Sequence, residues 1–276
     1  MKKTVNFDDP GAYHLYYGDA AGSPGTILTF FPWEQAPTGR AGAGELQETV
    51  FRIPQSAVGF WTARLVNHEL KRTTRFNETL LTFRDPDGLR LALIGLPGIE
   101  AEPAWADGDV PTEHAIRGFH SVSLMLDRTE ATGTILTNVF GFREVAKENN
   151  VTRYAVEGTA VGGIVDLHAI GGFLPARLGR GSVHHLAFRA VDDTAEFAMV
   201  KKLATEHGLR TTEQKDRDYF RSVYFREPGG VLFEIATDIP GFAVDEPADS
   251  LGAALKLPRF LEGHRGAIAA ALPVLA

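Results

Sequence analysis

The sequence predicts an α+β fold made of tandem βαβββ modules that form two domains. The first observation is a strand–turn–strand segment that occurs more than once: residues 82–93 read TFRDPDGLRLAL, and residues 224–235 read YFREPGGVLFEI. A looser copy covers residues 16–31. The second observation is a helix-like stretch ahead of each clear copy, and the third is the Pro/Gly turn inside it. Repetition of this kind indicates duplicated modules.

The individual elements follow from hydrophobic periodicity and from turn residues. In the first complete module, residues 49–53 predict a strand and residues 56–68 predict a helix with Phe60, Trp61 and Leu65 on its apolar stripe. Gly141 and Gly208 end the helices of the next two modules. The remaining predicted elements of those modules are strands at 121–126, 142–145, 153–156 and 163–170 with a helix at 129–140, then strands at 183–190, 210–212, 222–225 and 231–236 with a helix at 194–207.

Complete modules therefore span residues 46–98, 118–171 and 181–238, and the chain begins inside a further module. Residues 4–31 supply only the later strands of that module, whose opening strand and helix would take about 25 more residues. We expect an N-terminal domain at 1–102, a Pro/Asp/Gly-rich linker within 103–117 and a C-terminal domain at 118–240. A tail at 241–276 is expected to dock its amphipathic end, residues 261–275, on the surface.

Composition argues against several classes of function. The net charge is −7 and no basic tract occurs, so a nucleic-acid partner is not expected. No apolar run approaches the length of a membrane span, and the first nine residues lack the apolar region of a signal peptide. The chain has no cysteine, which excludes disulfides and thiolate metal sites and favours a cytoplasmic protein.

The last copy of the repeat carries the best candidate site. Glu234 stands there, where the earlier copy has Ala92 and the loosest copy has Thr29. Strand alternation puts His185 and Ala187 on one face of the module's first strand, so a histidine and a carboxylate could face each other. These are two thirds of a 2-His-1-carboxylate site for non-haem Fe(II), which leaves positions open for substrate and dioxygen. The alternative is an ordinary strand histidine and a solvated carboxylate.

Neighbouring residues could complete this site. On simple alternation His184 faces away from His185, where it is either an outer donor or a histidine satisfied by the backbone. Arg217 and Tyr224 could orient a phenolate or stabilise an anionic oxygenated intermediate, and a surface salt-bridge cluster is the alternative for Arg217. His120 opens its module as His185 does, so it is a candidate third ligand, although a structural role is expected.

Other polar residues have weaker claims. Asp166 and His168 end the module that His120 opens, so a second site is conceivable there, but structural roles are expected for them too. His14 and Tyr17 lie on a retained strand of the first module and could line a pocket. We find no convincing phosphate-binding Gly loop, nucleophile elbow or Ser/His/Asp order.

Together these residues resemble the vicinal oxygen chelate (glyoxalase/bleomycin-resistance/dioxygenase) superfamily, and within it the ring-cleaving dioxygenases related to hydroquinone and chlorohydroquinone 1,2-dioxygenases. The resemblance covers essentially the whole chain, and its most specific segments are 2–10 (KKTVNFDDP), 13–19 (YHLYYGD), 183–188 (VHHLAF) and 224–238 (YFREPGGVLFEIATD). It implies that His185 and Glu234 are ligands of Fe(II), with Mn(II) as the alternative. It also implies that His184, Arg217 and Tyr224 surround a small aromatic substrate, a hydroquinone or related phenol. The implied reaction uses dioxygen to open the ring of this substrate.

The chain departs from this family at one place. Family members carry a further His-His pair on the opening strand of the first module, and here Met1 directly precedes the segment that follows that strand and its helix. We expect a chain that begins inside a longer protein; the alternatives are an impaired site, or repair by water, by His120 or by a partner chain. An opened first module would also favour a homo-oligomer. A glyoxalase-type lyase or isomerase and a non-catalytic aromatic-binding protein are the alternative functions.

Overall fold

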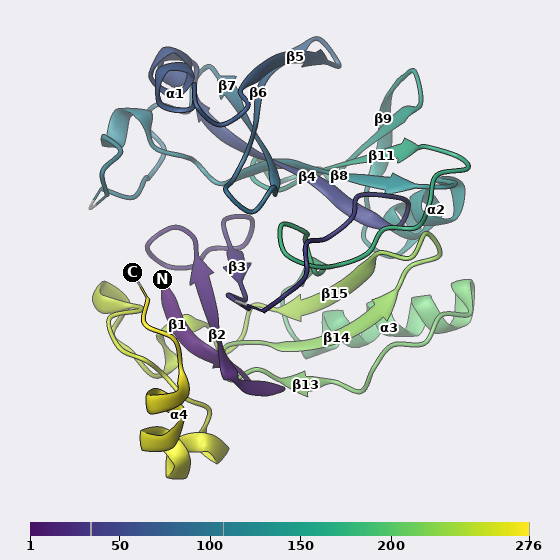
Figure 1. The fold of residues 1–276 in the computed structure, drawn as a ribbon. Coiled ribbons are helices and arrows are strands. Elements are labelled where there is room, and N and C mark those ends of the chain that lie inside the picture. Colours follow the sequence, from purple (N-terminus) through teal and green to yellow (C-terminus); the bar gives the residue numbers. More distant parts are fainter. Residues whose placement is uncertain (34, 107, 276) are drawn as a thin grey trace.

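The protein, seen here as a computed structural model, is a two-part β-structure with helices on its outer sides (Figure 1). The structure describes residues 1–33, 35–106 and 108–275, so one residue of the expected linker (107) and the last residue of the expected tail (276) lie outside it. An eight-stranded sheet forms the upper part of the view, and a three-stranded and a four-stranded sheet form the lower part. The predicted α+β class with tandem βαβββ modules is confirmed.

The elements are, in chain order, β1 (Lys2–Asn6), β2 (Asp9–Tyr17), β3 (Leu28–Phe30), β4 (Glu45–Pro54), η1 (Gln55–Ala57), α1 (Val58–Arg64), β5 (Lys71–Arg75), β6 (Glu78–Arg84), β7 (Arg90–Leu96), η2 (Thr112–His114), β8 (Phe119–Leu126), α2 (Glu130–Asn138), β9 (Arg143–Glu148), β10 (Val151–Ala155), β11 (Ile164–Ala169), β12 (Leu186–Ala190), α3 (Asp193–His207), β13 (Lys215–Asp216), β14 (Arg221–Arg226), β15 (Leu232–Thr237), η3 (Phe242–Val244), η4 (Ala248–Ser250), η5 (Arg259–His264) and α4 (Arg265–Ala271). Among the described residues, no helix is both long and apolar enough to cross a membrane.

The eight-stranded sheet joins two modules side by side. Its order is β5-β6-β7-β4-β8-β11-β10-β9, with β4 and β8 antiparallel at the centre and each parallel to the closing strand of its own module. Thr49 on β4 pairs with Val122 on β8, so the β ladder joins the modules that lie on either side of the predicted linker in sequence. The domain boundary at residues 103–117 remains a prediction. The eight-stranded sheet combines one module from before this segment with one module from after it.

The lower part contains the first and last modules. β1, β2 and β3 form the three-stranded sheet, which confirms that residues 4–31 supply later strands of a module. The last module forms the order β12-β15-β14-β13. Among the described residues, β3 and β12 lie at the edges of their sheets. The equivalent strands in the upper part of the molecule, β7 and β8, are both paired with β4.

The strand registers confirm the repeat that the sequence predicts. In each module, one position on the closing strand pairs with one position on the strand before it. The equivalent pairs are Tyr16 with Thr29, Thr82 with Ala92, Arg153 with Asp166, and Tyr224 with Glu234. The carboxylate of Glu234 therefore occupies a position that the first two modules fill with threonine and alanine.

Most predicted elements are present, with two corrections in the last module. α3 begins after Asp192, whose side chain accepts a hydrogen bond from Ala195 N, and it ends at Gly208 with φ of 64°. The strand predicted at 183–190 begins only at Leu186, and residues 183–185, which follow the turn at Gly181 (φ 75°), are irregular. The strand predicted at 210–212 is wrong: one bond from Thr212 N to Tyr224 O is made, but the ladder starts at Lys215.

The tail docks as predicted. After β15 the tail runs beside β1, where Lys256 N donates to Lys3 O at 2.9 Å, and its last helix, α4, contacts β2 (Figure 1). Leu257 and Leu272 are buried against Val5, which gives β1 an apolar cover.

Candidate active site

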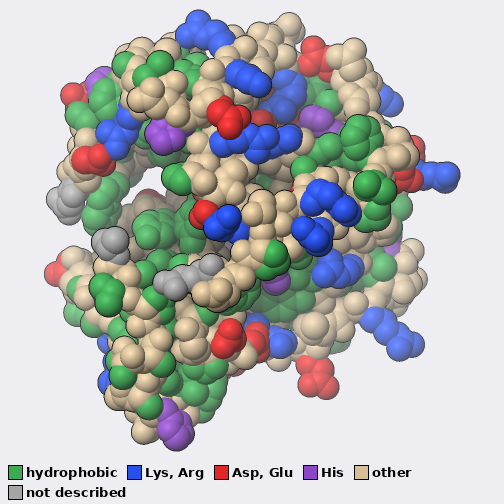
Figure 2. Space-filling model, viewed as in Figure 1, with side chains coloured by type: hydrophobic (Ala, Val, Ile, Leu, Met, Phe, Trp, Pro, Cys, Tyr) green, Lys and Arg blue, Asp and Glu red, His purple; other side chains and the backbone are tan. Residues whose placement is uncertain are grey.

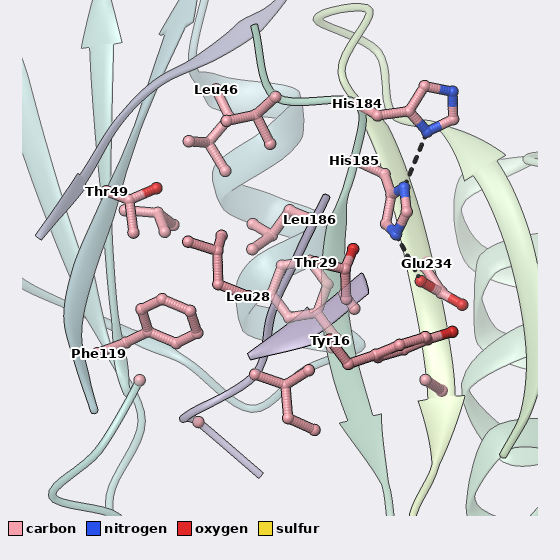
Figure 3. A pocket seen from close by; sticks show the side chains of 18 of the residues that line it. Tyr16, Leu28, Thr29, Leu46, Thr49, Phe119, His184, His185, Leu186 and Glu234 are labelled. Carbon is pink, nitrogen blue, oxygen red and sulfur yellow. Dashed lines mark hydrogen bonds and ion pairs between the residues drawn. The ribbon is translucent and has the colours of Figure 1, made fainter. Parts of the chain in front are cut away.

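A cavity of about 1470 Å³ lies between the two parts of the molecule. Figure 2 shows an opening between the upper and lower parts, with apolar side chains inside it. Leu46, Thr49 and Phe119 form one wall, and His184, His185, Glu234 and Tyr16 form the opposite side (Figure 3). One side of the cavity is therefore apolar and the other carries titratable groups. This division suits a flat apolar ligand with polar substituents.

His185 and Glu234 meet at the polar side. His185 Nε2 lies 2.8 Å from Glu234 Oε2 (Figure 3). Glu234 is on β15, which lies between β12 and β14, so its side chain is only 3 % exposed. Burial by itself raises the pKa of Glu234, but the hydrogen bond and charge of His185 and the hydrogen bond of Tyr224 outweigh it and lower the pKa below its usual value. The carboxylate is therefore ionised at neutral pH.

Tyr224 holds the other oxygen of this carboxylate. Its hydroxyl donates to Glu234 Oε1 at 2.6 Å and accepts from Ser222 Oγ at 3.1 Å, because the three residues share one face of the β14–β15 pair. Burial and the negative charge of Glu234 raise the pKa of Tyr224. The phenol therefore remains a neutral donor, and the carboxylate is fixed in orientation.

His184 contacts His185 rather than facing away from it. The two Nδ1 atoms are 2.9 Å apart, and both side chains line the cavity. The prediction that His184 faces away from His185 is wrong because both histidines precede the strand, which begins at Leu186, so strand alternation does not apply to them. Burial and the charge of His185 lower the pKa of His184, so its Nδ1 can accept a hydrogen bond from His185 Nδ1–H. Such a bond would orient the ring of His185 with Nε2 toward Glu234, where an ion would replace the Nε2 proton.

Arg217 lies at the edge of the same cavity. One of its terminal nitrogens donates to Asp8 Oδ2 at 2.9 Å, and its guanidinium carbon is 5.7 Å from the centroid of the Tyr224 ring. Burial alone would lower the pKa of Arg217, but Asp8 and Tyr224 raise it, so it keeps its positive charge. The residue thus makes the salt bridge considered as an alternative and also presents a cation to the cavity.

The His185–Glu234 pair has the chemistry and spacing of two neighbouring metal ligands. Two donor atoms that each lie about 2.1 Å from one ion at a right angle are ~3 Å apart, close to the 2.8 Å observed. An imidazole and a carboxylate are also the donors that non-haem Fe(II) accepts. Over residues 1–33, 35–106 and 108–275, however, no group of three histidine, cysteine, aspartate or glutamate side chains could hold a metal ion as it stands.

His120 does not belong to this site. It lies on β8 in the other part of the molecule, with Nε2 3.6 Å from Glu78 Oε1. Arg153 donates to both oxygens of the buried Asp166 at 2.7 and 2.9 Å and to Glu78 at 2.6 Å. The place where a second metal site was conceivable therefore holds an ion-pair network around a guanidinium. His168 is nearby on β11, and its buried Nε2 has no hydrogen-bond partner among the described residues.

Of the two residues predicted to line a pocket, His14 does so and Tyr17 does not. Tyr17 is 55 % exposed, whereas Tyr16 is buried and lines the cavity with His14. The signal that could have identified Tyr16 is the repeat, since its place on β2 is equivalent to that of Tyr224 on β14.

Comparisons with known proteins identify the family of the chain. The sequence profile of the Glyoxalase/Bleomycin resistance protein/Dioxygenase superfamily matches residues 118–235. The chain is 42 % identical over 269 residues to the Bacillus subtilis (strain 168) protein named "Putative ring-cleaving dioxygenase MhqO", covering 96 % of this chain and 84 % of that protein. It is 34 % identical over 274 residues to the chlorohydroquinone/hydroquinone 1,2-dioxygenase of Sphingobium indicum, covering 95 % and 84 %.

Solved structures show the same relationship. The crystal structure titled as a "putative dioxygenase" from Bacillus subtilis matches with a TM-score of 0.93 at 41 % identity, covering all of this chain and 88 % of that chain. Glyoxalase I from Zea mays matches with a TM-score of 0.56 at 14 % identity over 86 % of this chain and 83 % of that chain, which shows a common fold only. The chain belongs to the Glyoxalase/Bleomycin resistance protein/Dioxygenase superfamily, and its close homologues there are named as ring-cleaving dioxygenases.

Proposed function

We propose that the protein is an extradiol-type dioxygenase that opens the ring of a hydroquinone or related phenol, with Fe(II), or alternatively Mn(II), held by His185 and Glu234. The observation that carries the proposal is the 2.8 Å contact between these residues at the polar side of a largely apolar cavity. The similarity to a chlorohydroquinone/hydroquinone 1,2-dioxygenase supports the substrate class. A homo-oligomer and a cytoplasmic setting remain predictions.

Each polar residue of the site has a distinct task in this proposal. Glu234 and His185 hold the ion, which when bound would supply the redox chemistry that activates dioxygen. Tyr224 fixes the orientation of Glu234 through its 2.6 Å hydrogen bond, and His184 fixes the ring of His185 through the 2.9 Å contact between their Nδ1 atoms. The two donors are thus held before the ion arrives, which favours tight binding.

The remaining residues position the aromatic ring. Two para hydroxyls cannot bind one ion together, so a hydroquinone needs further groups to hold its ring. Arg217 offers a fixed positive charge for a phenolate oxygen, and Phe119, Leu46 and Leu186 offer apolar contacts for the ring faces. Apolar walls also limit the access of water to the reacting carbon.

The structure disfavours a glyoxalase-type lyase or isomerase. Such a reaction would need acidic ligands from more than one module. The positions equivalent to Glu234 hold Thr29 and Ala92 in two modules, and in the remaining module Asp166 is paired with Arg153. A non-catalytic protein that binds small aromatics would use the same cavity. The oxygen-uptake experiment below distinguishes that function from a dioxygenase.

The test is oxygen uptake by the full chain after anaerobic loading with Fe(II), with hydroquinone as substrate. We expect one dioxygen consumed per hydroquinone, loss of the aromatic absorbance and no formation of benzoquinone. Glu234→Gln should abolish uptake, and Glu45→Gln, a matched change at a buried glutamate on β4, should retain it. Hydroquinone binding without oxygen uptake would indicate the aromatic-binding protein and refute the dioxygenase.

A further inference from the structure

Ser222 carries a fully buried hydroxyl beside the proposed metal ligands. It lies on β14, pairs with Ala236 on β15 and is 0 % exposed. Its hydroxyl donates to the hydroxyl of Tyr224 at 3.1 Å, and Tyr224 in turn donates to Glu234 Oε1 at 2.6 Å. Buried polar groups in folded proteins are almost always hydrogen-bonded, and here the bond of the serine leads to the carboxylate.

The three side chains form a chain of hydrogen bonds that all point the same way. Ionised Glu234 can only accept, so the single hydrogen of the Tyr224 hydroxyl goes to the carboxylate. The tyrosine oxygen then acts as an acceptor, and Ser222 is the donor that satisfies it. A donor to that oxygen polarises the O–H group and strengthens its bond to Glu234. It also restrains the position of the tyrosine hydroxyl.

The repeat indicates that this serine serves the site rather than the fold. The equivalent residues of the other modules are Leu80, Val151 and His14, each two positions before the residue that pairs with the closing strand. Leu80 and Val151 are buried apolar side chains, so the strand does not need a hydroxyl at this position. A hydrogen-bonding side chain stands there only where a tyrosine follows: His14 contacts Tyr16, as the serine contacts its own tyrosine.

We propose that Ser222 is a positioning residue that acts on the metal ligand Glu234 through Tyr224. This rests on the proposed function, in which Glu234 binds the ion. Without the serine hydroxyl, the tyrosine oxygen loses its donor and the bond from Tyr224 to the carboxylate weakens. The carboxylate is then less firmly oriented, so the ion is held less tightly, although Ser222 never contacts it.

The test is a double-mutant cycle in the affinity of the full chain for cobalt(II), read from the visible absorbance of the bound ion. Ser222→Ala should weaken binding about 3- to 10-fold, the range for one neutral hydrogen bond. In the Tyr224→Phe background the same substitution should change the affinity by less than about 2-fold, because the acceptor of the serine hydroxyl is gone. The visible spectrum of the bound cobalt should keep its shape, since His185 and Glu234 remain in place.

A matched control and a metal-free readout complete the experiment. Ser123 on β8 is also fully buried, but its Oγ has no hydrogen-bond partner among the described residues and it lies in the other part of the molecule. Ser123→Ala should therefore leave the cobalt affinity unchanged. Urea unfolding of the metal-free chain should show the same non-additivity of Ser222→Ala and Tyr224→Phe, because the two side chains are coupled before any ion binds.

The outcomes separate this inference from the proposed function. An effect of Ser222→Ala that is equally large in Tyr224→Phe would mean that the serine acts by packing or directly on the carboxylate, and it overturns the proposal. An unchanged cobalt affinity in Ser222→Ala, or a changed spectrum, overturns it as well. These results leave the dioxygenase proposal standing. A wild type that binds no cobalt refutes the proposed function and, with it, any role of Ser222 in metal binding.

Discussion

The hydrogen bond from Tyr224 to Glu234 makes a prediction that needs neither metal nor substrate. In Tyr224→Phe the buried carboxylate loses the 2.6 Å bond to Oε1, while the 2.8 Å contact of Oε2 with His185 remains. Hydrogen bonds to charged groups contribute about 1.5–3 kcal/mol, and Glu234 is only 3 % exposed, so water cannot replace the lost donor without rearrangement. We expect the free energy of unfolding of the metal-free protein to fall by about 2 kcal/mol at pH 7.

The loss of stability caused by Tyr224→Phe should depend on pH. Tyr224 helps to lower the pKa of Glu234, and a carboxyl whose pKa is lowered by folding stabilises the protein above its unfolded-state pKa, about 4.3. This contribution is lost as the pH falls through the lower folded-state pKa. The difference between the wild type and Tyr224→Phe should therefore be largest at neutral pH and should shrink below about pH 4.

Urea unfolding of the metal-free protein, followed by circular dichroism at several pH values, measures both effects. Tyr17→Phe removes a hydroxyl from a tyrosine that is 55 % exposed, and as a matched control it should change the free energy of unfolding by less than about 0.5 kcal/mol. The stabilising role of the Tyr224–Glu234 hydrogen bond is refuted if Tyr224→Phe behaves like this control at pH 7, or if its effect is as large in acid as at neutral pH.

Two further substitutions test the scaffold. Arg153→Ala removes the partner of the buried Asp166, so it should lower the free energy of unfolding, measured in urea, by about 3–5 kcal/mol. It should not weaken metal binding, because the Arg153–Asp166 pair lies in the other part of the molecule from His185 and Glu234. A lower metal affinity in this variant would contradict that independence. Gly181→Ala places a Cβ 2.1 Å from the carbonyl oxygen of Asp87, so it should displace the segment before β12 and weaken metal binding. The control Gly172→Ala meets no atom within 4 Å, so it should lower the melting temperature through its positive φ and leave metal binding unchanged. Equal effects of the two glycine substitutions on metal binding would contradict this assignment.

Much of the scaffold follows from local signals in the sequence. The two clear hairpins are marked by alternating residues around Pro/Gly turns, and Gly208 ends α3 where a left-handed residue is required. The difference between Glu234, Ala92 and Thr29 also points to Glu234 among these three copies, and the strand registers confirm that the three positions are equivalent. These features depend on neighbours close in sequence, so a single chain reveals them.

The features that the sequence did not reveal depend on distant contacts. The antiparallel pairing of β4 with β8 joins modules across the predicted linker, and no local pattern indicates which modules share a sheet. Asp166 lies where Glu234 lies in its own module, so the sequence leaves a second metal site conceivable there, although a structural role is expected. Its partner across the strands is Arg153 rather than a tyrosine, and only the register shows that a guanidinium takes up its charge.

The most direct test of the central claim is the metal stoichiometry of the full chain after anaerobic loading with Fe(II) and removal of loosely bound iron. We expect one tightly held iron per chain, lost in His185→Ala and in Glu234→Gln. The iron should be retained in His120→Ala, because His120 lies beside Glu78 in the other part of the molecule. Absence of specifically bound iron in the wild type would contradict the claim. So would iron that stays bound when both His185 and Glu234 are replaced.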